Sequence, residues 1–204
     1  MGERVKCKAI VLSEATYGEG SKMLTALSDE FGRVSIAAKG AKSAKSRFLA
    51  VSQQFCYSSM ELSAGRNGIY TLCEADLINS FYGLREDVDA LFLASDIAST
   101  VLKVAREEDR DTDLLRLTLN TFYFLSQKEN AGRLGLAKDV FRIRLSCDQG
   151  FFAVPETVRY RGTAQAIDHI VESDFRTLFS FNVSPEVLEE LDRISQRAYD
   201  SMFD

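Results

Sequence analysis

The first eighty residues alternate between hydrophobic and polar positions with the period of two that is typical of β-strands. In residues 5–12 ("VKCKAIVL"), apolar residues flank each of the two lysines and the segment then becomes continuously apolar. That change is typical of a strand that enters a core. Similar patterns predict further strands at residues 22–28, 33–39, 53–63 and 68–81. Five short strands in so short a segment predict a small β-barrel.

Turn signals separate these predicted strands. Asp29–Gly32 ends in a glycine where a positive φ is expected, and Asn67-Gly68 is a strong hairpin signal. Tyr17–Lys22 ("YGEGSK") superficially resembles a phosphate-binding loop, but it lacks the order of Gly, Lys and hydroxyl residue that such a loop requires. We therefore interpret it as a loop between strands.

Beyond Gly83 the hydrophobic period lengthens to about 3.6, which indicates helices. Helices are predicted within residues 85–109, 111–127, 133–150 and 182–203. Gly150 is expected to end the third, while Ser184 as N-cap and Pro185 at the first helical position are expected to open the fourth. The fold class is thus α+β: a barrel domain at residues 1–81 followed by an all-α helical domain at 82–204.

The charge is distributed unevenly along the chain, whose formal net charge is -5. Residues 1–50 contain nine Lys or Arg and five Asp or Glu, whereas residues 51–204 contain sixteen and twenty-five. Four cations and no acid fall within residues 37–48, "AAKGAKSAKSRF". Because distant charges are screened over about 10 Å, this local patch decides whether a polyanion binds, and the acidic total does not exclude nucleic acid.

The composition points to a folded protein of the cytoplasm. No run of eighteen apolar residues exists, and the N-terminal "MGERVKCKAI" lacks the apolar stretch of a signal peptide, so we expect no membrane association. The four cysteines lie far apart without a CxxC pair, which indicates reduced core residues rather than a zinc clamp or a disulfide framework.

The residues needed for catalysis are sparse. His169 is the single histidine, and its helical spacing favours a structural role. Acidic clusters around residues 106–113 fit helix ends better than a cation site, since they lack the spacing of an EF-hand. We therefore expect no enzymatic activity, no metal and no cofactor.

The small residues between the four cations suggest a flexible loop that lays its charges along an extended backbone, as a polyphosphate requires. Aromatic residues near it in sequence could stack on bases, or could fill the barrel: Tyr17, Phe31, Phe48, Phe55 and Tyr57. Cations together with aromatic residues can hold single-stranded nucleic acid, but basic runs are often only solvated loops, so the residues alone leave both interpretations open. The candidate nucleic-acid-binding residues are Lys39, Lys42, Lys45 and Arg47, with Lys22, Arg33, Lys6 and Lys8 as possible extensions.

Several of these segments resemble the RecO family of bacterial recombination mediators. The likeness rests on "AIVLSEATYGEGSKMLTALSDEFGRVSIAAKGAKSAKSRF" and on "LINSFYGLREDVDAL", and it covers about the first 125 residues. The resemblance implies an oligonucleotide-binding (OB) barrel plus a helical domain. It also implies binding of single- and double-stranded DNA, annealing of complementary strands, and cooperation with RecR and single-strand-binding protein so that RecA is loaded. The expected location is the cytoplasm, in association with the nucleoid.

The C-terminal third departs from the family pattern. Many members carry a four-cysteine zinc module where this chain has "SCDQGFFAVPETVRYRGTAQA", and only Cys147 lies there. The module is therefore expected to be absent. For the acidic, apolar-ended tail of single-strand-binding protein, the resemblance requires an apolar pocket with a basic rim, for which Arg133, Arg142 and Arg144 are candidates.

Two other functions fit the sequence. One is a protein-interaction scaffold whose helical domain is the functional part, while the basic segment only keeps the barrel soluble. The other is a hydrolase or nuclease that uses Asp and Glu with an exchangeable metal.

Overall fold

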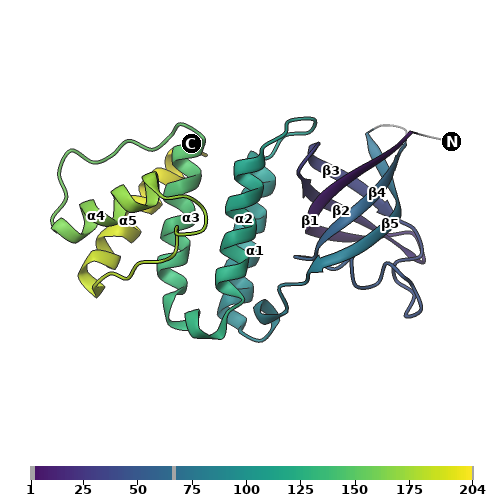
Figure 1. The fold of residues 1–204 in the computed structure, drawn as a ribbon, viewed down its shortest axis with the longest axis horizontal. Coiled ribbons are helices and arrows are strands. Elements are labelled where there is room, and N and C mark those ends of the chain that lie inside the picture. The colour runs from purple at the N-terminus through teal and green to yellow at the C-terminus, as the bar shows by residue number, and fades with distance from the viewer. Residues whose placement is uncertain (1–2, 66–67, 204) are drawn as a thin grey trace. The chain divides into compact units, whose positions relative to one another are not determined.

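The computed structural model describes residues 3–65 and 68–203. In it, five strands close into a barrel (Figure 1). The strands are β1 (Arg4–Tyr17), β2 (Ser21–Ser28), β3 (Gly32–Ala38), β4 (Tyr57–Ala64) and β5 (Ile69–Asn79). Their order is β1-β2-β3-β5-β4, with β4 paired back to β1 and a short parallel ladder joining β3 to β5. The predicted barrel is confirmed, and full closure removes its exposed strand edges.

The first strand continues well beyond its predicted end at residue 12. A register shift between Val11 and Ser13 in the pairing with β2 marks a bulge, and the strand then runs on to Tyr17. The bulge explains the difference, because it interrupts the alternation on which the prediction depended. The turn at Gly18–Gly20 lies between β1 and β2, as interpreted from the sequence. Of the predicted Asn67-Gly68 hairpin turn, Asn67 lies outside the described residues.

The barrel interior is filled by small and branched apolar side chains from every strand, including Cys7, Leu24, Ile36, Met60 and Leu72. Burial raises the pKa of the Cys7 thiol to about 12, so this cysteine stays protonated. It is a free thiol in the core, as the sequence predicts.

The helices follow the barrel in the order that the period change predicts. They are α1 (Val88–Val104), α2 (Thr112–Leu125), α3 (Leu134–Asp148), α4 (Arg161–Glu172) and α5 (Pro185–Ser201), with short 3₁₀ helices at Tyr82–Arg85 and Lys128–Arg133. This confirms the fold class: an OB-type barrel followed by a helical part. By internal contacts the chain divides into a barrel unit, Met1–Tyr82 with Ser95–Leu115, and a helical unit, Gly83–Ala94 with Arg116–Asp204.

Short polar side chains fix several helix ends. One carboxylate oxygen of Asp87 accepts the backbone N–H groups of Asp89 and Ala90 at the start of α1. Gly150, with a φ of 78°, follows the end of α3, and the N–H of Phe151 donates to the carbonyl of Ser146 at 2.8 Å. Ser184 occupies the N-cap position of α5, but its hydroxyl makes no capping hydrogen bond.

Candidate nucleic-acid interface

The basic loop, residues 39–47, lies between β3 and β4 and is anchored by the barrel core. Ala41, Phe48 and Val51 are members of the buried core cluster, with Ala41 fully buried. Lys39, Lys42, Lys45 and Arg47 are all exposed. Apolar anchors thus hold the segment against the barrel while its cations face solvent.

The backbone of this segment forms consecutive turns, not the extended strand expected from its small residues. The N–H of Ser43 donates to the carbonyl of Gly40 at 3.2 Å, and the N–H of Ser46 donates to the carbonyl of Ser43 at 2.9 Å. Serines at turn positions and a positive φ of 70° at Gly40 account for the difference. The backbone positions that carry the cations therefore lie closer together than they would in an extended chain.

Among the residues that the structure describes, the three lysines of the basic loop have no acidic partner. Across residues 3–65 and 68–203, no carboxylate lies within salt-bridge distance of Lys39, Lys42 or Lys45. The Arg47 guanidinium donates to the carbonyl of Cys73 at 2.6 Å and lies 4.7 Å from the ring centre of Phe48. These contacts hold Arg47 in place and neutralise none of its charge.

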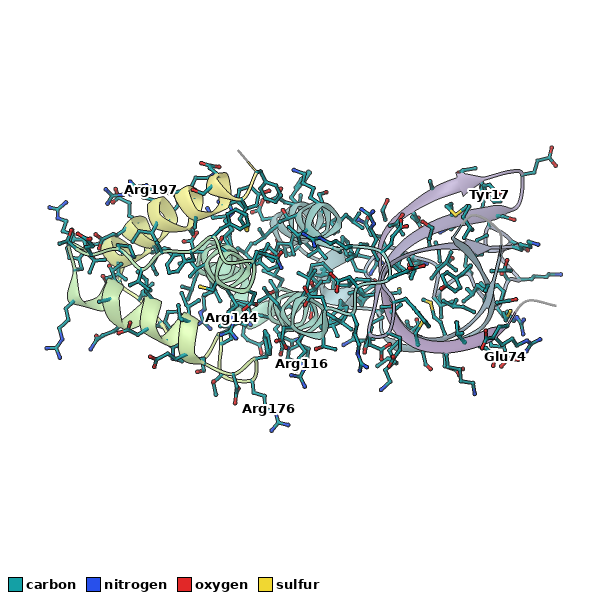
Figure 2. All side chains as sticks on the ribbon, turned by 90° about the horizontal axis from the view of Figure 1, so that it is seen from above. Tyr17, Glu74, Arg116, Arg144, Arg176 and Arg197 are labelled. Atoms are coloured by element: carbon teal, nitrogen blue, oxygen red, sulfur yellow. The ribbon has the colours of Figure 1, made fainter. Side chains whose placement is uncertain are left out.

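The turn between β1 and β2 lies beside the basic loop and carries an exposed aromatic side chain. The N–H of Lys42 donates to the carbonyl of Gly20 at 3.2 Å, and the N–H of Gly40 donates to the hydroxyl of Ser21 at 3.3 Å. Tyr17, which pairs with Ser21 in the β1–β2 ladder, is 51% exposed (Figure 2). A stacking surface and a cluster of cations thus lie on adjacent segments.

The other aromatic candidates are not available for stacking. Phe48 and Phe55 are buried, and Phe31 packs against the core with its ring centre 5.7 Å from that of Tyr70. Tyr57 is half-buried. Of the five aromatic residues named from the sequence, Tyr17 is the one with an exposed ring. Most of the others pack in or against the barrel core instead of offering a surface for a base.

Lys22 and Arg33 already have partners within the barrel unit. The ammonium of Lys22 lies 2.6 Å from a carboxylate oxygen of Glu14. The Arg33 guanidinium donates to the carbonyl of Leu102 at 3.1 Å and lies 3.6 Å from Glu107. Arg33 therefore contacts the C-terminal end of α1, where a cation is favoured.

Lys6 and Lys8 project from the outer face of β1, where acidic side chains lie near them. Lys6 is paired with Glu61 in the β1–β4 ladder, and Glu61 is paired with Glu74 in the next ladder. Figure 2 shows Glu74 on the side of the barrel away from Tyr17. Lys6 and Lys8 are exposed, but the neighbouring carboxylates reduce the local positive potential.

The remaining chemical candidates have structural roles. His169 Nε2 lies 3.0 Å from the carbonyl of Thr177, and its ring packs on Phe181. Asp111 accepts the N–H of Leu114 and so caps α2, while Arg110 pairs with Glu30. Within the described part of the chain, no group of three or more His, Cys, Asp or Glu side chains is arranged to hold a metal ion.

Arg133, Arg142 and Arg144 also serve the helical unit itself. Arg133 donates to the carbonyls of Phe179 and Phe181, and Arg144 donates to three carbonyls at the end of α4. Arg142 donates to Gln196 at 2.6 Å and lies over the ring of Tyr199. These arginines hold helices and loops together, which a sequence does not reveal because most of their partners are backbone atoms.

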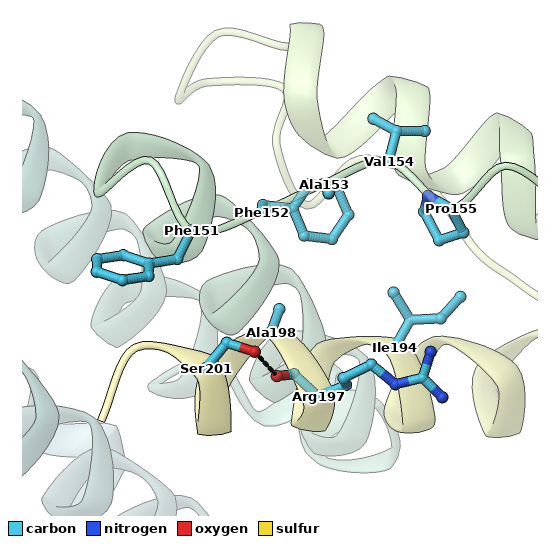
Figure 3. A pocket seen from close by; sticks show the side chains of 9 residues that line it. All are labelled: Phe151, Phe152, Ala153, Val154, Pro155, Ile194, Arg197, Ala198 and Ser201. Carbon is cyan, nitrogen blue, oxygen red and sulfur yellow. Dashed lines mark hydrogen bonds between the residues drawn. The ribbon is translucent and has the colours of Figure 1, made fainter. Parts of the chain in front are cut away.

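An apolar pocket of about 260 Å³ lies between the segment after α3 and the last turns of α5 (Figure 3). Phe151, Val154 and Ile194 supply apolar side chains, and Arg197 supplies a cation. The hydroxyl of Ser201 is turned inward along α5, donating to the carbonyl of Arg197 at 2.9 Å. The pocket therefore combines an apolar lining with one basic side chain, Arg197. No helix among the described residues has the length and apolar character needed to cross a membrane.

The comparisons with known proteins place this architecture, a closed OB-type barrel followed by a helical part, in a class of DNA repair proteins. A family model described as "Recombination protein O N terminal" matches residues 1–81. The DNA repair protein RecO of Acetivibrio thermocellus is 33% identical over 95% of this chain and 89% of its own length. The chain belongs to the RecO family, so its role is in DNA repair and recombination.

Other relatives match over less of their length. The RecO protein of Clostridium novyi is 32% identical over 72% of this chain and 56% of its own length. That of Bacillus subtilis is 35% identical over 60% of this chain and 48% of its own length. For these relatives the chain spans about half the curated protein.

Proposed function

We propose that this chain binds single- and double-stranded DNA through the basic loop, anneals complementary strands and assists RecA loading, without a catalytic step. The observation that supports this most is the anchored loop beside exposed Tyr17, whose lysines have no carboxylate partner in the described part of the chain. Cations that are already held in ion pairs would offer a ligand less charge. Because the RecO relatives are DNA repair proteins, DNA is the polyanion that we expect the basic loop to bind.

The mechanism is electrostatic. Complementary strands repel each other through their phosphates, and lysines that neutralise phosphates lower this repulsion without covering the base edges. Lys39, Lys42, Lys45 and Arg47 supply the charges, and Tyr17 supplies a surface on which a base stacks. Base pairing then provides the specificity, so no general acid, nucleophile or metal is needed.

The test is annealing of complementary oligonucleotides coated with single-strand-binding protein, measured across a salt series. Replacement of all four cations of the basic loop by Ala is expected to abolish acceleration and to reduce the log-log salt slope of binding by roughly 3 to 4. A matched control removes four exposed cations of the helical unit: Lys128→Ala, Arg159→Ala, Arg161→Ala and Arg193→Ala. Equal loss in both variants would indicate a general charge effect, and unchanged annealing in the loop variant would favour the scaffold alternative.

Two partners belong to this proposal: RecR, and the tail of single-strand-binding protein. The pocket of Figure 3 suits an acidic tail with an apolar last residue, because Arg197 can pair with its carboxylates while the apolar lining takes the side chain. Arg197→Glu is expected to weaken binding of the tail peptide at least about tenfold, because one ion pair is lost and the new carboxylate repels the acidic tail. Arg193→Glu, also exposed on α5, is the control and should bind normally.

The nuclease alternative is tested with labelled DNA and Mg²⁺ or Mn²⁺. We expect no cleavage by the wild-type chain above a buffer control. Metal-dependent cleavage that survives replacement of the basic-loop cations would contradict a non-enzymatic mechanism.

A further inference from the structure

Residues 151–160, here called the strap, connect α3 to α4 without forming a helix or a strand. The first half of the strap, including Val154 and Pro155, lines the apolar pocket described above. Figure 3 shows the strap on one side of this pocket and α5, with Ile194 and Arg197, on the other. The shape of the pocket therefore depends on what holds the strap in place.

The beginning of the strap is tied to the end of α3. The backbone N–H groups of Phe151 and Phe152 both donate to the carbonyl of Ser146, at 2.8 Å and 3.1 Å. Ser146 is buried, so this acceptor belongs to the rigid part of the helical unit. The residues that line the pocket follow directly after this first anchor.

The end of the strap is tied to α5 by one carboxylate. One oxygen of Glu190 accepts the backbone N–H of Arg159 at 2.7 Å. The other oxygen accepts the N–H of Tyr160 at 3.2 Å and the hydroxyl of Thr163 at 2.6 Å. Desolvation alone would raise the pKa of this carboxyl, but the three hydrogen bonds hold the pKa below its usual range. Glu190 therefore stays ionised, which keeps both of its oxygens available as acceptors.

Helix α4 needs a partner of this kind at its N-terminus. It has no acidic residue in its first turn, and Tyr160, at the N-cap position, makes no capping hydrogen bond with its side chain. Glu190 supplies from another helix the acceptor and the negative charge that a helix N-terminus favours. The two helices approach closely here, since a Cβ added at Gly162 would lie 3.0 Å from a methyl group of Val187.

The same face of α5 holds the strap and lines the pocket. Ile194 and Arg197 follow Glu190 by four and seven positions, and this spacing places the three side chains on one face of the helix. The anchor at Glu190 and the wall of the pocket are thus parts of one rigid element.

We propose that Glu190 is a positioning residue for the pocket of Figure 3, where it holds the strap in place for an acidic peptide with an apolar last residue. With both ends of the strap anchored, Val154 and Pro155 stand opposite α5 before the peptide arrives. Binding then need not order the strap, which would cost conformational entropy. The inference rests on the proposed function and deepens it.

The first measurement is hydrogen exchange at the backbone amides of Arg159 and Tyr160, followed by NMR. Glu190→Gln keeps the shape of the side chain but leaves one acceptor oxygen and no charge. We expect at least about tenfold faster exchange at these two amides, because a charge-assisted hydrogen bond is lost. The control, Glu189→Gln, removes the same charge from the exposed neighbouring position on α5 and should exchange like wild type. Unchanged exchange in Glu190→Gln would overturn the anchor.

The second measurement is binding of a labelled peptide of four aspartates and a C-terminal phenylalanine. Glu190→Gln should weaken binding at least about threefold, since the peptide must now order the strap. The sign of the change is diagnostic, because removal of a negative charge alone would strengthen binding of an acidic peptide. Glu189→Gln should therefore bind at least as tightly as wild type. Equal or tighter binding by Glu190→Gln would overturn the positioning role.

Binding of a thymidine oligonucleotide by the same variants separates this inference from the proposed function. Glu190→Gln should bind the oligonucleotide like wild type. A wild-type chain that binds the oligonucleotide but not the peptide would overturn the tail pocket and this inference, and would leave DNA binding standing. One that binds the peptide but not the oligonucleotide would overturn the role of the basic loop alone. If Glu190→Gln unfolds at a lower temperature, Thr163→Val, which removes one donor to Glu190, repeats both measurements with the same expected results.

Discussion

The ammonium of Lys22 lies 2.6 Å from a carboxylate oxygen of Glu14, on the neighbouring strand of the barrel. The Lys22 side chain is only 17% exposed, and its ammonium also lies 3.5 Å from the carbonyl of Ser52. Lys42, in contrast, is exposed and has no acidic partner among the described residues. Two lysines of the barrel unit thus differ in how much charge they offer a ligand.

This contrast predicts different effects of the same substitution. Lys42→Gln is expected to weaken binding of single-stranded DNA and to reduce the log-log salt slope by about 0.7, the loss of one phosphate contact. Lys22→Gln should leave the slope unchanged, because its charge is already balanced by Glu14. Fluorescence anisotropy across a salt series measures both. A salt slope that falls equally for the two variants would contradict the proposal that Lys42 contacts phosphate and Lys22 does not.

Tyr17 is expected to contribute through its ring. Tyr17→Ala should weaken binding of single-stranded DNA by about 1 to 3 kcal/mol, the usual value of one stacked base, whereas Tyr17→Phe should bind like wild type. Because the side chain is half exposed, thermal stability should change little. Equal binding by the Ala and Phe variants would show that Tyr17 does not stack.

The barrel could be predicted because apolar and polar residues alternate along its strands. Which of its cations are exposed and which have a partner could not be predicted. The basic loop is visible as a density of charge in one segment. The pairing of Lys22 with Glu14, and of Arg33 with the carbonyl of Leu102, depends on strand register and on the approach of a helix. Neither follows from the local sequence, and so exposed and engaged cations appear equivalent before the fold is known.

Helix α4 carries a clear sequence signal, although residues 161–172 are not among the helices predicted above. Its buried residues, Thr163, Ala166, Ile167 and Ile170, follow the i, i+3, i+4, i+7 spacing of an amphipathic helix. The helical spacing recognised around His169 belongs to this same element.

Gly32 is expected to be essential to the barrel unit. Its φ is 62°, and a Cβ placed there would overlap the backbone carbonyl oxygens of Arg106 and Asp109. Gly32→Ala should therefore lower the free energy of unfolding by at least about 2 kcal/mol, from backbone strain together with displaced backbone. Gly20→Ala is the control, since a Cβ at Gly20 would meet nothing within 4 Å and the φ of this residue is not positive. Chemical denaturation measures both, and equal stability of the two variants would contradict the close approach.

Asp139 makes the stability of the helical unit depend on pH. This carboxyl is 1% exposed between α3 and α5, and burial raises its pKa to about 6, although the hydroxyl of Ser195 donates to it at 2.7 Å. A carboxyl whose pKa is raised in the folded state favours folding while protonated. Its contribution is complete below the unfolded value near 3.8 and is lost as the pH rises through about 6.

Asp139→Asn removes this titration while leaving an oxygen that can accept from Ser195. The variant should gain stability relative to wild type as the pH rises from about 4 to 7, reaching roughly 3 kcal/mol. Other carboxyls titrate in both proteins, so the difference between the two unfolding free energies isolates Asp139. Lys138 lies 3.8 Å from Asp139 and also pairs with Asp192, and this cation limits the gain. A difference that is constant with pH, or that falls as the pH rises, would show that Asp139 ionises normally in the folded chain.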